Sequence, residues 1–223
     1  MSPAPVLPLR DRRQAGRLLA GSLAPYRGRP GLLVLALPRG GVPVAFEIAR
    51  SLGAPLDIFV VRKIGMPGHP EYAIGAIASG GVRVMEPLPG GTVRPQVLQE
   101  AIERETGELA RREQVYRGEQ PPADIRGRTV LVVDDGMATG STMEAAVLAL
   151  RQQQPARLVV VVPVAPRDTV ARLRARVDEV ACLATPEPFR AVSLWYQDFP
   201  QCTDQEVCEL LEESRREPAH LSH

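Results

Sequence analysis

Short runs of apolar residues constrain the fold of this chain more than any other feature. Leu32–Leu37, Thr129–Val133 and Arg157–Val162 are five or six residues long and nearly free of polar side chains. Runs of this length that end at turn residues predict strands buried on both faces, as in a parallel sheet covered by helices. Leu56–Val61 and Glu179–Leu183 predict two further strands of the same kind.

Helical patterns alternate with these strands, which predicts an α/β fold: a parallel central sheet flanked by helices. The predicted helices are Asp11–Ala24, Val42–Leu52, Pro95–Arg117, Met143–Gln153, Arg167–Arg176 and Asp204–Glu213. Asp11 is the expected N-cap of the first helix. Ile74–Met85 predicts a small pair of strands, whereas Arg62–Tyr72, rich in Gly and Pro, predicts a loop.

The length of 223 residues predicts one domain over 1–223, since an average domain has ~150 residues. We expect its core at about 32–183, a polar helical insertion at about 94–118, and tail elements at about 184–214. A hydrophobic fraction of 44% and a charged fraction of 24% are those of a globular chain.

Composition also limits the partners. The net charge is +1, so no bulk positive field indicates nucleic acid. Cys182, Cys202 and Cys208 form no CxxC pair, so neither a disulfide framework nor a zinc site is indicated. No apolar run approaches the ~20 residues of a membrane helix, and the expected location is the cytoplasm.

The segment that follows the run Thr129–Val133 carries the chemistry. Asp134 and Asp135 place two carboxylates directly after a buried strand, and Gly136–Thr142 is a loop of small residues that opens a helix. Glycine allows backbone N–H groups to approach an anion, and a helix N-terminus adds positive partial charge. The pattern predicts a phosphate cradle beside two groups that bind a diol or a metal ion. The alternative is a strand that ends in Asp-Asp before an ordinary Ser/Thr helix cap.

Val132–Met143, with the sequence VVDDGMATGSTM, resembles the phosphoribosyl pyrophosphate (PRPP) motif of type I phosphoribosyltransferases. The resemblance implies the fold of that family, with a small variable hood over the acceptor. It also implies that two carboxylates hold the ribose hydroxyls, directly or through Mg²⁺ and water, while the loop binds the 5-phosphate. The implied PRPP-binding residues are Asp134, Asp135, Gly136, Met137, Ala138, Thr139, Gly140, Ser141 and Thr142.

Two other segments resemble further parts of the family's site. Leu37–Gly41 resembles the pyrophosphate loop, which makes Arg39, Gly40 and Gly41 pyrophosphate-binding candidates. Arg62 and Lys63 resemble the basic pair before the mobile catalytic loop, and Lys63 is the single lysine among 27 basic residues. The alternative for Arg39 is a surface arginine after a proline turn, and the alternative for Arg62 and Lys63 is a solvated basic pair.

The acceptor is less clearly marked. The 6-oxopurine enzymes usually have Asp where this chain has Ala138, and the adenine enzymes resemble it better there. The catalytic candidates are Arg39, Arg62, Lys63 and Glu71. Glu71 is the candidate for a carboxylate that contacts the base, and a solvated loop residue is at least an equal alternative for it. For His69 a surface position is favoured. For Phe189, Trp195, Tyr196 and Phe199, packing of the hood is favoured over stacking on a base.

The function these features favour is transfer of the 5-phosphoribosyl group of PRPP to a nitrogen nucleophile, a nucleobase, with release of pyrophosphate. Mg²⁺ is the expected cofactor, and the family implies a homodimer. The alternative is a PRPP-binding sensor or regulator with little catalysis. A phosphoryl-receiver domain is less favoured, because its acidic pair follows the first strand without such a loop.

Overall fold

Parallel strands with buried faces form the centre of the fold, as the apolar runs predict. The computed structural model describes residues 6–66, 69–85 and 94–216. The strands are β1 (Leu32–Ala36), β2 (Leu56–Ile58), β3 (Val61–Met66), β4 (His69–Ala78), β5 (Val82–Met85), β6 (Thr129–Val133), β7 (Arg157–Val164) and β8 (Glu179–Ala184). The helices are α1 (Arg12–Ser22), α2 (Gly41–Leu52), α3 (Pro95–Arg117), α4 (Ser141–Gln152), α5 (Arg167–Arg174) and α6 (Asp204–Arg216), with 3₁₀ turns at Ala24–Tyr26 and Val192–Trp195.

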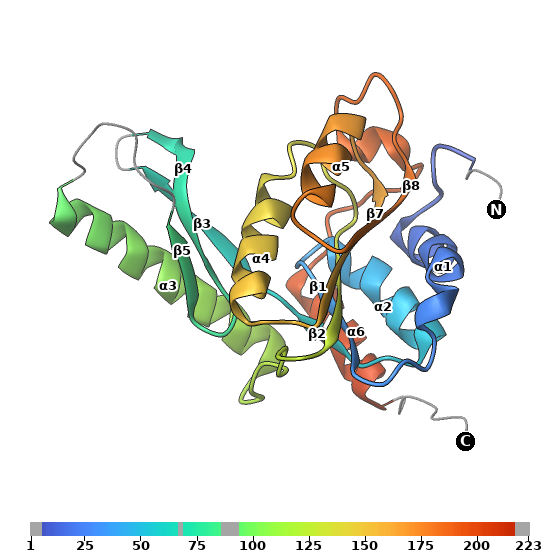
Figure 1. Cartoon of the computed structure of the whole chain (residues 1–223), viewed down its shortest axis with the longest axis horizontal. Helices are drawn as coiled ribbons and strands as arrows, with labels where there is room; N and C mark the ends of the chain where they lie inside the picture. The colour runs from blue at the N-terminus through green and yellow to red at the C-terminus, as the bar shows by residue number, and fades with distance from the viewer. Residues whose placement is uncertain (1–5, 67–68, 86–93, 217–223) are drawn as a thin grey trace.

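The central sheet has the order β2-β1-β6-β7-β8, and each neighbouring pair is parallel. Side chains of each strand alternate between two apolar cores. On β6, Leu131 and Val133 join the core under α1, α2 and α6, while Val130 and Val132 join the core under α4 and α5. Figure 1 shows these two groups of helices on opposite sides of the sheet. Because both faces are covered, the strands read as unbroken apolar runs, and the predicted α/β class is confirmed.

A second sheet, β3-β4-β5, is antiparallel and stands beside the central sheet together with α3 (Figure 1). The prediction of a loop at Arg62–Tyr72 is therefore wrong. The strand predicted at Leu56–Val61 is also too long, because β2 ends at Ile58 and Val61 begins β3 of the second sheet. The described part of Arg62–Tyr72 belongs to the hairpin of β3 and β4, in which Lys63 pairs with Ala76. The pairing register shifts between Ile64 and Met66, so the irregularity that Gly65 introduces is absorbed as a bulge inside a strand.

Helix α3 has the predicted bounds and is anchored to the core. Ala101 and Leu109 are buried against the apolar core. At its end, the Arg117 guanidinium contacts the Asp57 carboxylate of β2 at 3.0 Å, with both side chains nearly inaccessible to solvent. Within the described residues, no helix is both long and apolar enough to cross a membrane.

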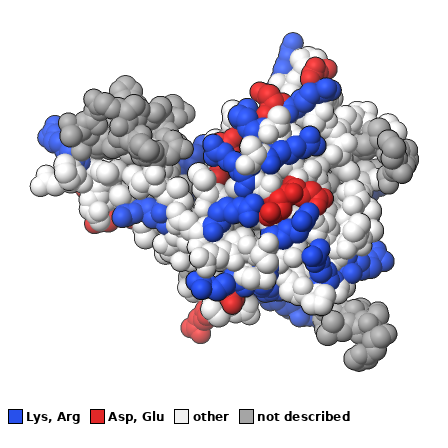
Figure 2. All heavy atoms as spheres, in the orientation of Figure 1, with Lys and Arg blue, Asp and Glu red and all other residues white. Residues whose placement is uncertain are grey.

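Arginine supplies most of the positive charge, and it is interleaved with acidic residues on the surface. On the face in Figure 2, basic and acidic side chains lie beside one another. Arg151 pairs with Asp178 at 3.0 Å and Arg172 with Glu144 at 3.4 Å. Exposed pairs of this kind contribute little to stability.

Close packing of α1 on α2 gives the first prediction. A Cβ atom at Gly16 would lie 2.5 Å from the Val44 carbonyl oxygen and 2.8 Å from Glu47 Cβ, whereas nothing lies within 4 Å of one at Gly21. We expect Gly16→Ala to lower the free energy of unfolding by about 1–3 kcal/mol through overpacking. Gly21→Ala, on the same helix, should leave it unchanged or raise it by up to ~1 kcal/mol. Urea unfolding measures both, and equal effects would contradict the close packing.

Candidate functional site

Two loops meet at the carboxyl ends of the neighbouring strands β1 and β6. The strands are in register, with Ala36 opposite Val133, and the Leu37 N–H donates to the Val133 carbonyl at 2.9 Å. From here the chain enters α2 on one face of the sheet and α4 on the other. Such a switch point is where ligands bind in open α/β sheets.

Two glycines bring the loop after β1 against the loop after β6. A Cβ atom at Gly40 would lie 2.0 Å from Asp135 Oδ2, and one at Gly41 would lie 2.6 Å from the Val133 carbonyl oxygen. Any side chain at either position would displace these atoms. The predicted pyrophosphate loop and the predicted PRPP motif are thus brought into direct contact.

The acidic pair lies half-buried between the loops. Asp134 Oδ1 accepts the backbone N–H of Asp135 at 2.8 Å, and Asp135 Oδ2 accepts the Arg12 Nε–H at 2.8 Å. Burial raises the pKa of both carboxyls, and the charge of Asp135 raises that of Asp134 further. For Asp135, hydrogen bonding and attraction by Arg12 oppose the effect of burial.

These two carboxylates are also the residues suited to hold a metal ion. Within the part of the chain that the structure describes, no three His, Cys, Asp or Glu side chains gather as a metal-binding group. Mg²⁺ is commonly held by one or two carboxylates together with water and substrate phosphates, so a pair is sufficient. A divalent cation would also offset the burial of two neighbouring negative charges, and the donor set therefore fits Mg²⁺.

The phosphate-loop candidate follows the acidic pair and leads into α4. Gly140 has φ +78° at the start of that helix, and a Cβ there would lie 2.6 Å from Thr169 Cγ2. On the α5 side, Thr169 Oγ1 donates to the Ala138 carbonyl at 3.1 Å, and Arg172 Nη2 donates to the Thr139 carbonyl at 2.9 Å. Among the described residues, the backbone N–H groups of Ala138, Thr139 and Gly140 have no protein acceptor. The loop therefore has donors available for an anion.

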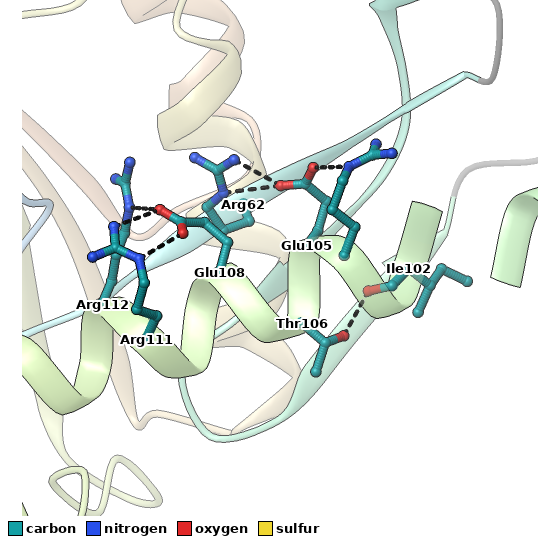
Figure 3. Close-up of polar contacts among 8 residues, drawn as sticks. Arg62, Ile102, Glu105, Thr106, Glu108, Arg111 and Arg112 are labelled. Carbon is teal, nitrogen blue, oxygen red and sulfur yellow. Dashed lines mark hydrogen bonds and ion pairs between the residues drawn. The ribbon is translucent and has the colours of Figure 1, made fainter. Parts of the chain in front are cut away.

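The basic pair of β3 is divided between two neighbours, because successive side chains of a strand point to opposite faces. Lys63 Nζ lies 3.1 Å from Ser141 Oγ, at the start of α4. Arg62 turns toward α3, where its Nη2 and Nε lie 2.7 and 3.0 Å from Glu105 Oε2 (Figure 3). Only Lys63 of this pair contacts the phosphate-loop candidate.

Arg39 lies at the other end of the site. Its peptide bond to Pro38 is cis, and its side chain is partly exposed, with Nη1 3.9 Å from Asp204 Oδ1. A cavity of about 350 Å³ separates this segment from the tail after the second 3₁₀ turn. It is lined by Arg12, Arg39, Gly40, Asp135, Phe199, Pro200, Gln201 and Cys202. Two of the three pyrophosphate candidates, Arg39 and Gly40, therefore line this cavity.

The remaining sequence candidates fall into two groups. Glu71 and His69 lie on β4, but their side chains are outside the described residues. The aromatic cluster packs the tail onto the core, with Tyr196 and Phe199 ring centroids 4.9 Å apart. Packing is thus confirmed for these rings, and the Tyr196 hydroxyl also donates to the Asp135 carbonyl at 2.6 Å.

A larger cavity of about 840 Å³ lies on the α5 side of the phosphate-loop candidate. It is bounded by Ala138 and Thr139 of that loop, by the first turns of α5, and by the tail loop 186–190. Phe189 and Arg190 contribute an aromatic ring and a cation to its wall. Its volume is within the range of small-molecule pockets.

Three contributors to the site have no signal in the sequence: Arg12, Thr169 and Arg172. Each lies on a helix far from the motif along the chain, among many other polar residues. Arg12 is one of several arginines around Asp11, and nothing in the pattern separates it from Arg13.

A five-stranded parallel sheet with an acidic pair and a loop of small residues at its switch point defines a type I phosphoribosyltransferase fold. Comparison with known proteins agrees. The model of the phosphoribosyl transferase domain family matches residues 13–194. The chain therefore belongs to the phosphoribosyl transferase family.

Individual relatives support the same assignment. The "Putative phosphoribosyl transferase" of Mycobacterium tuberculosis strain H37Rv is 46% identical over 209 residues, which cover 93% of this chain. The match covers 47% of that relative, so the chain spans about half the length of the curated proteins it matches. The crystal structure of TT1426 from Thermus thermophilus is 47% identical, with a TM-score of 0.82 over 92% of this chain and 98% of that one.

The buried acidic pair gives a pH-dependent prediction. Because the pKa of Asp134 is raised in the folded protein, its charged form destabilises the fold at neutral pH. We expect Asp134→Asn, whose oxygen still accepts the Asp135 N–H, to raise the urea midpoint at pH 7 in metal-free buffer. This gain should shrink as the pH falls toward 3.8, the ordinary value, below which the carboxyl is protonated in both states. Asp198→Asn, at an exposed position, should change neither the urea midpoint at pH 7 nor its dependence on pH. A lower midpoint for Asp134→Asn at pH 7 would contradict the prediction.

Proposed function

We propose that this phosphoribosyltransferase transfers the 5-phosphoribosyl group of PRPP to a nitrogen nucleophile, a nucleobase, and releases pyrophosphate. One observation carries the proposal: the close approach of Gly40 to Asp135, which brings the predicted pyrophosphate loop against the acidic pair that precedes the phosphate-loop candidate. A substrate with a phosphate at one end, a diol in the middle and a pyrophosphate at the other end matches this order of groups.

In the proposed reaction a C–N bond forms at the anomeric carbon and the C–O bond to pyrophosphate breaks. The bonding electron pair leaves with pyrophosphate, and the acceptor nitrogen loses its proton to a base. The loop from Gly136 to Thr142 binds the 5-phosphate through N–H and hydroxyl groups. Asp134 and Asp135 accept hydrogen bonds from the ribose hydroxyls and fix the ring for displacement.

Charge stabilisation is the main task of the site, because negative charge grows on pyrophosphate in the transition state. Arg39 and the N–H groups of Gly40 and Gly41 are the proposed ligands of the leaving group. Lys63 adds a mobile point charge beside Ser141. Mg²⁺, held through water by Asp134 and Asp135, would supply further positive charge on the substrate oxygens.

Arg62 and Glu71 act from the hairpin in this proposal. Arg62, paired with Glu105 of α3, orients β3 and thereby Lys63 (Figure 3). Glu71 on β4 is the proposed base-contacting carboxylate. The 840 Å³ cavity beside Ala138 is the proposed acceptor site, and the absence of Asp at position 138 favours adenine-like bases over 6-oxopurines.

The proposal includes the expectations of one domain over 1–223, a cytoplasmic location and a homodimer. These are supported by composition and by family resemblance. Size-exclusion chromatography with light scattering measures the oligomeric state directly.

Incubation of the protein with PRPP, Mg²⁺ and a panel of nucleobases tests the activity. Release of pyrophosphate with one base, together with the matching nucleoside monophosphate, is the expected result. Binding of PRPP without release in any combination would instead favour the sensor. Failure to bind PRPP at all would overturn both functions.

The divided basic pair gives a kinetic prediction. We expect Lys63→Met to lower kcat/KM by about 10²-fold, the usual order for removing one charge-stabilising donor. Lys63→Arg should retain part of the rate, because it keeps the charge but changes its geometry. A near-normal rate for Lys63→Arg would mean that the single lysine at this position is accidental.

Arg62→Met is the matched control, since it removes the neighbouring cation. We expect it to lower the melting temperature by loosening β3 from α3, and to reduce kcat/KM less than Lys63→Met does. An equal loss of kcat/KM in the two variants would give Arg62 a direct part in the reaction.

A further inference from the structure

We propose that Arg12, in the first turn of α1, is a ligand of the leaving pyrophosphate opposite Arg39. Until the substrate binds, the Asp135 carboxylate is hydrogen-bonded to the Arg12 guanidinium. The inference rests on the proposed function and assigns it a residue outside all three sequence motifs. It also assigns a role in substrate binding to α1, which otherwise only covers the sheet.

The Arg12 guanidinium is held on three sides. Its Nε donates to Asp135 Oδ2 at 2.8 Å, and its Nη1 donates to the Pro200 carbonyl at 2.7 Å. The Phe199 ring centroid lies 3.8 Å from Cζ, so the guanidinium lies over the ring. With the side chain 11% exposed, this cation is nearly enclosed and its neighbours determine its position.

The same guanidinium retains unused donors. An arginine has five N–H donors, and the contacts above engage one on Nε and one on Nη1. Within the described residues no acceptor contacts Nη2. A planar fork with open donors is suited to phosphate oxygens.

The cavity beside Arg12 has the charge that a pyrophosphate requires. Arg12 and Arg39 both line the 350 Å³ space, together with the Gly40 backbone. Asp135 is the one acidic residue among its lining residues, and it already contacts Arg12. Two cations against one carboxylate make the charge of the lining residues positive, and Asp204, which lies 3.9 Å from Arg39 Nη1, is outside that lining.

Substrate binding supplies those partners. In the proposed function the Asp135 carboxylate accepts hydrogen bonds from ribose hydroxyls, and a hydroxyl that reaches Oδ2 competes with the Arg12 Nε–H. A nearly enclosed guanidinium without a carboxylate needs another anion, and the pyrophosphate of the substrate is the nearest one. After pyrophosphate departs, the contact between Arg12 and Asp135 forms again, which favours product release.

The backbone of Arg12 is fixed, so only its side chain has to change partners. Asp11 caps α1 by accepting the Gln14 N–H at 2.6 Å, and Gly16 packs the helix against Val44 of α2. Arg13 follows in the same turn but contacts Glu47 of α2 at 3.1 Å. It therefore offers a cation of identical chemistry, one residue away, that does not line the cavity.

Calorimetric titration with inorganic pyrophosphate in metal-free buffer tests the proposal without relying on turnover. We expect Arg12→Gln to weaken pyrophosphate binding by about tenfold or more, the order of a lost charge-assisted contact. Arg13→Gln should change it by less than about twofold, since that side chain faces Glu47. Ribose 5-phosphate, which lacks the pyrophosphate, should bind Arg13→Gln as it binds the unchanged protein and should bind Arg12→Gln no more weakly, because its hydroxyls then meet no competition from Arg12 for Asp135.

Arg12→Lys is a second variant that controls for loss of folding, because it keeps a positive charge beside Asp135. Its affinity for pyrophosphate should lie between those of the unchanged protein and Arg12→Gln, with melting temperatures measured for all variants. Unchanged or tighter binding of pyrophosphate by Arg12→Gln would overturn the proposal, and Arg12 would then only neutralise Asp135. If the unchanged protein binds neither pyrophosphate nor PRPP, the proposed function fails as well. If it binds both, and the Arg12 variants bind pyrophosphate as tightly as it does, the role of Arg12 is overturned while the proposed function is retained.

Discussion

The contact between the loops after β1 and β6 is the constraint on which the site depends. Parallel pairing of these strands sets the two loops side by side, and Gly40 leaves the space that Asp135 occupies. The pairing exists because each strand is apolar on both faces and is covered by helices on both sides. The same property that buries the sheet therefore brings together groups that lie about a hundred residues apart along the chain.

Asp135 is where the outer parts of the molecule meet this centre. Its carboxylate contacts Arg12 of α1 and its carbonyl accepts the Tyr196 hydroxyl, so both the start and the tail of the described chain are fixed at one residue. Burial of a charged pair opposes folding, and these hydrogen bonds partly offset that cost. Natural active sites commonly retain groups that are unfavourable for stability when their ligand is absent.

The sequence predicts well those features that depend on neighbouring residues. The buried strands, most helix bounds and the motif from Val132 to Met143 are contiguous, so local pattern and chemistry identify them. Arg12, Thr169 and Arg172 reach the site through tertiary packing, and no local pattern separates them from other polar helix residues. The loop expected at Arg62–Tyr72 is wrong because pairing with β4 and packing against α3 outweigh the turn preference of its Gly and Pro residues.

Thr169 and Arg172 have a consequence for the energetics of anion binding. They hold the carbonyl oxygens of Ala138 and Thr139 from the α5 side, which fixes the orientation of those peptide planes before any ligand arrives. The dipoles of the loop are thus preorganised, and in the proposed function a phosphate would meet N–H groups that need no reorganisation of the backbone. Two carbonyl oxygens of the loop are already engaged by donors of α5, while three consecutive N–H groups have no acceptor among the described residues, so this arrangement favours an anion over a further cation.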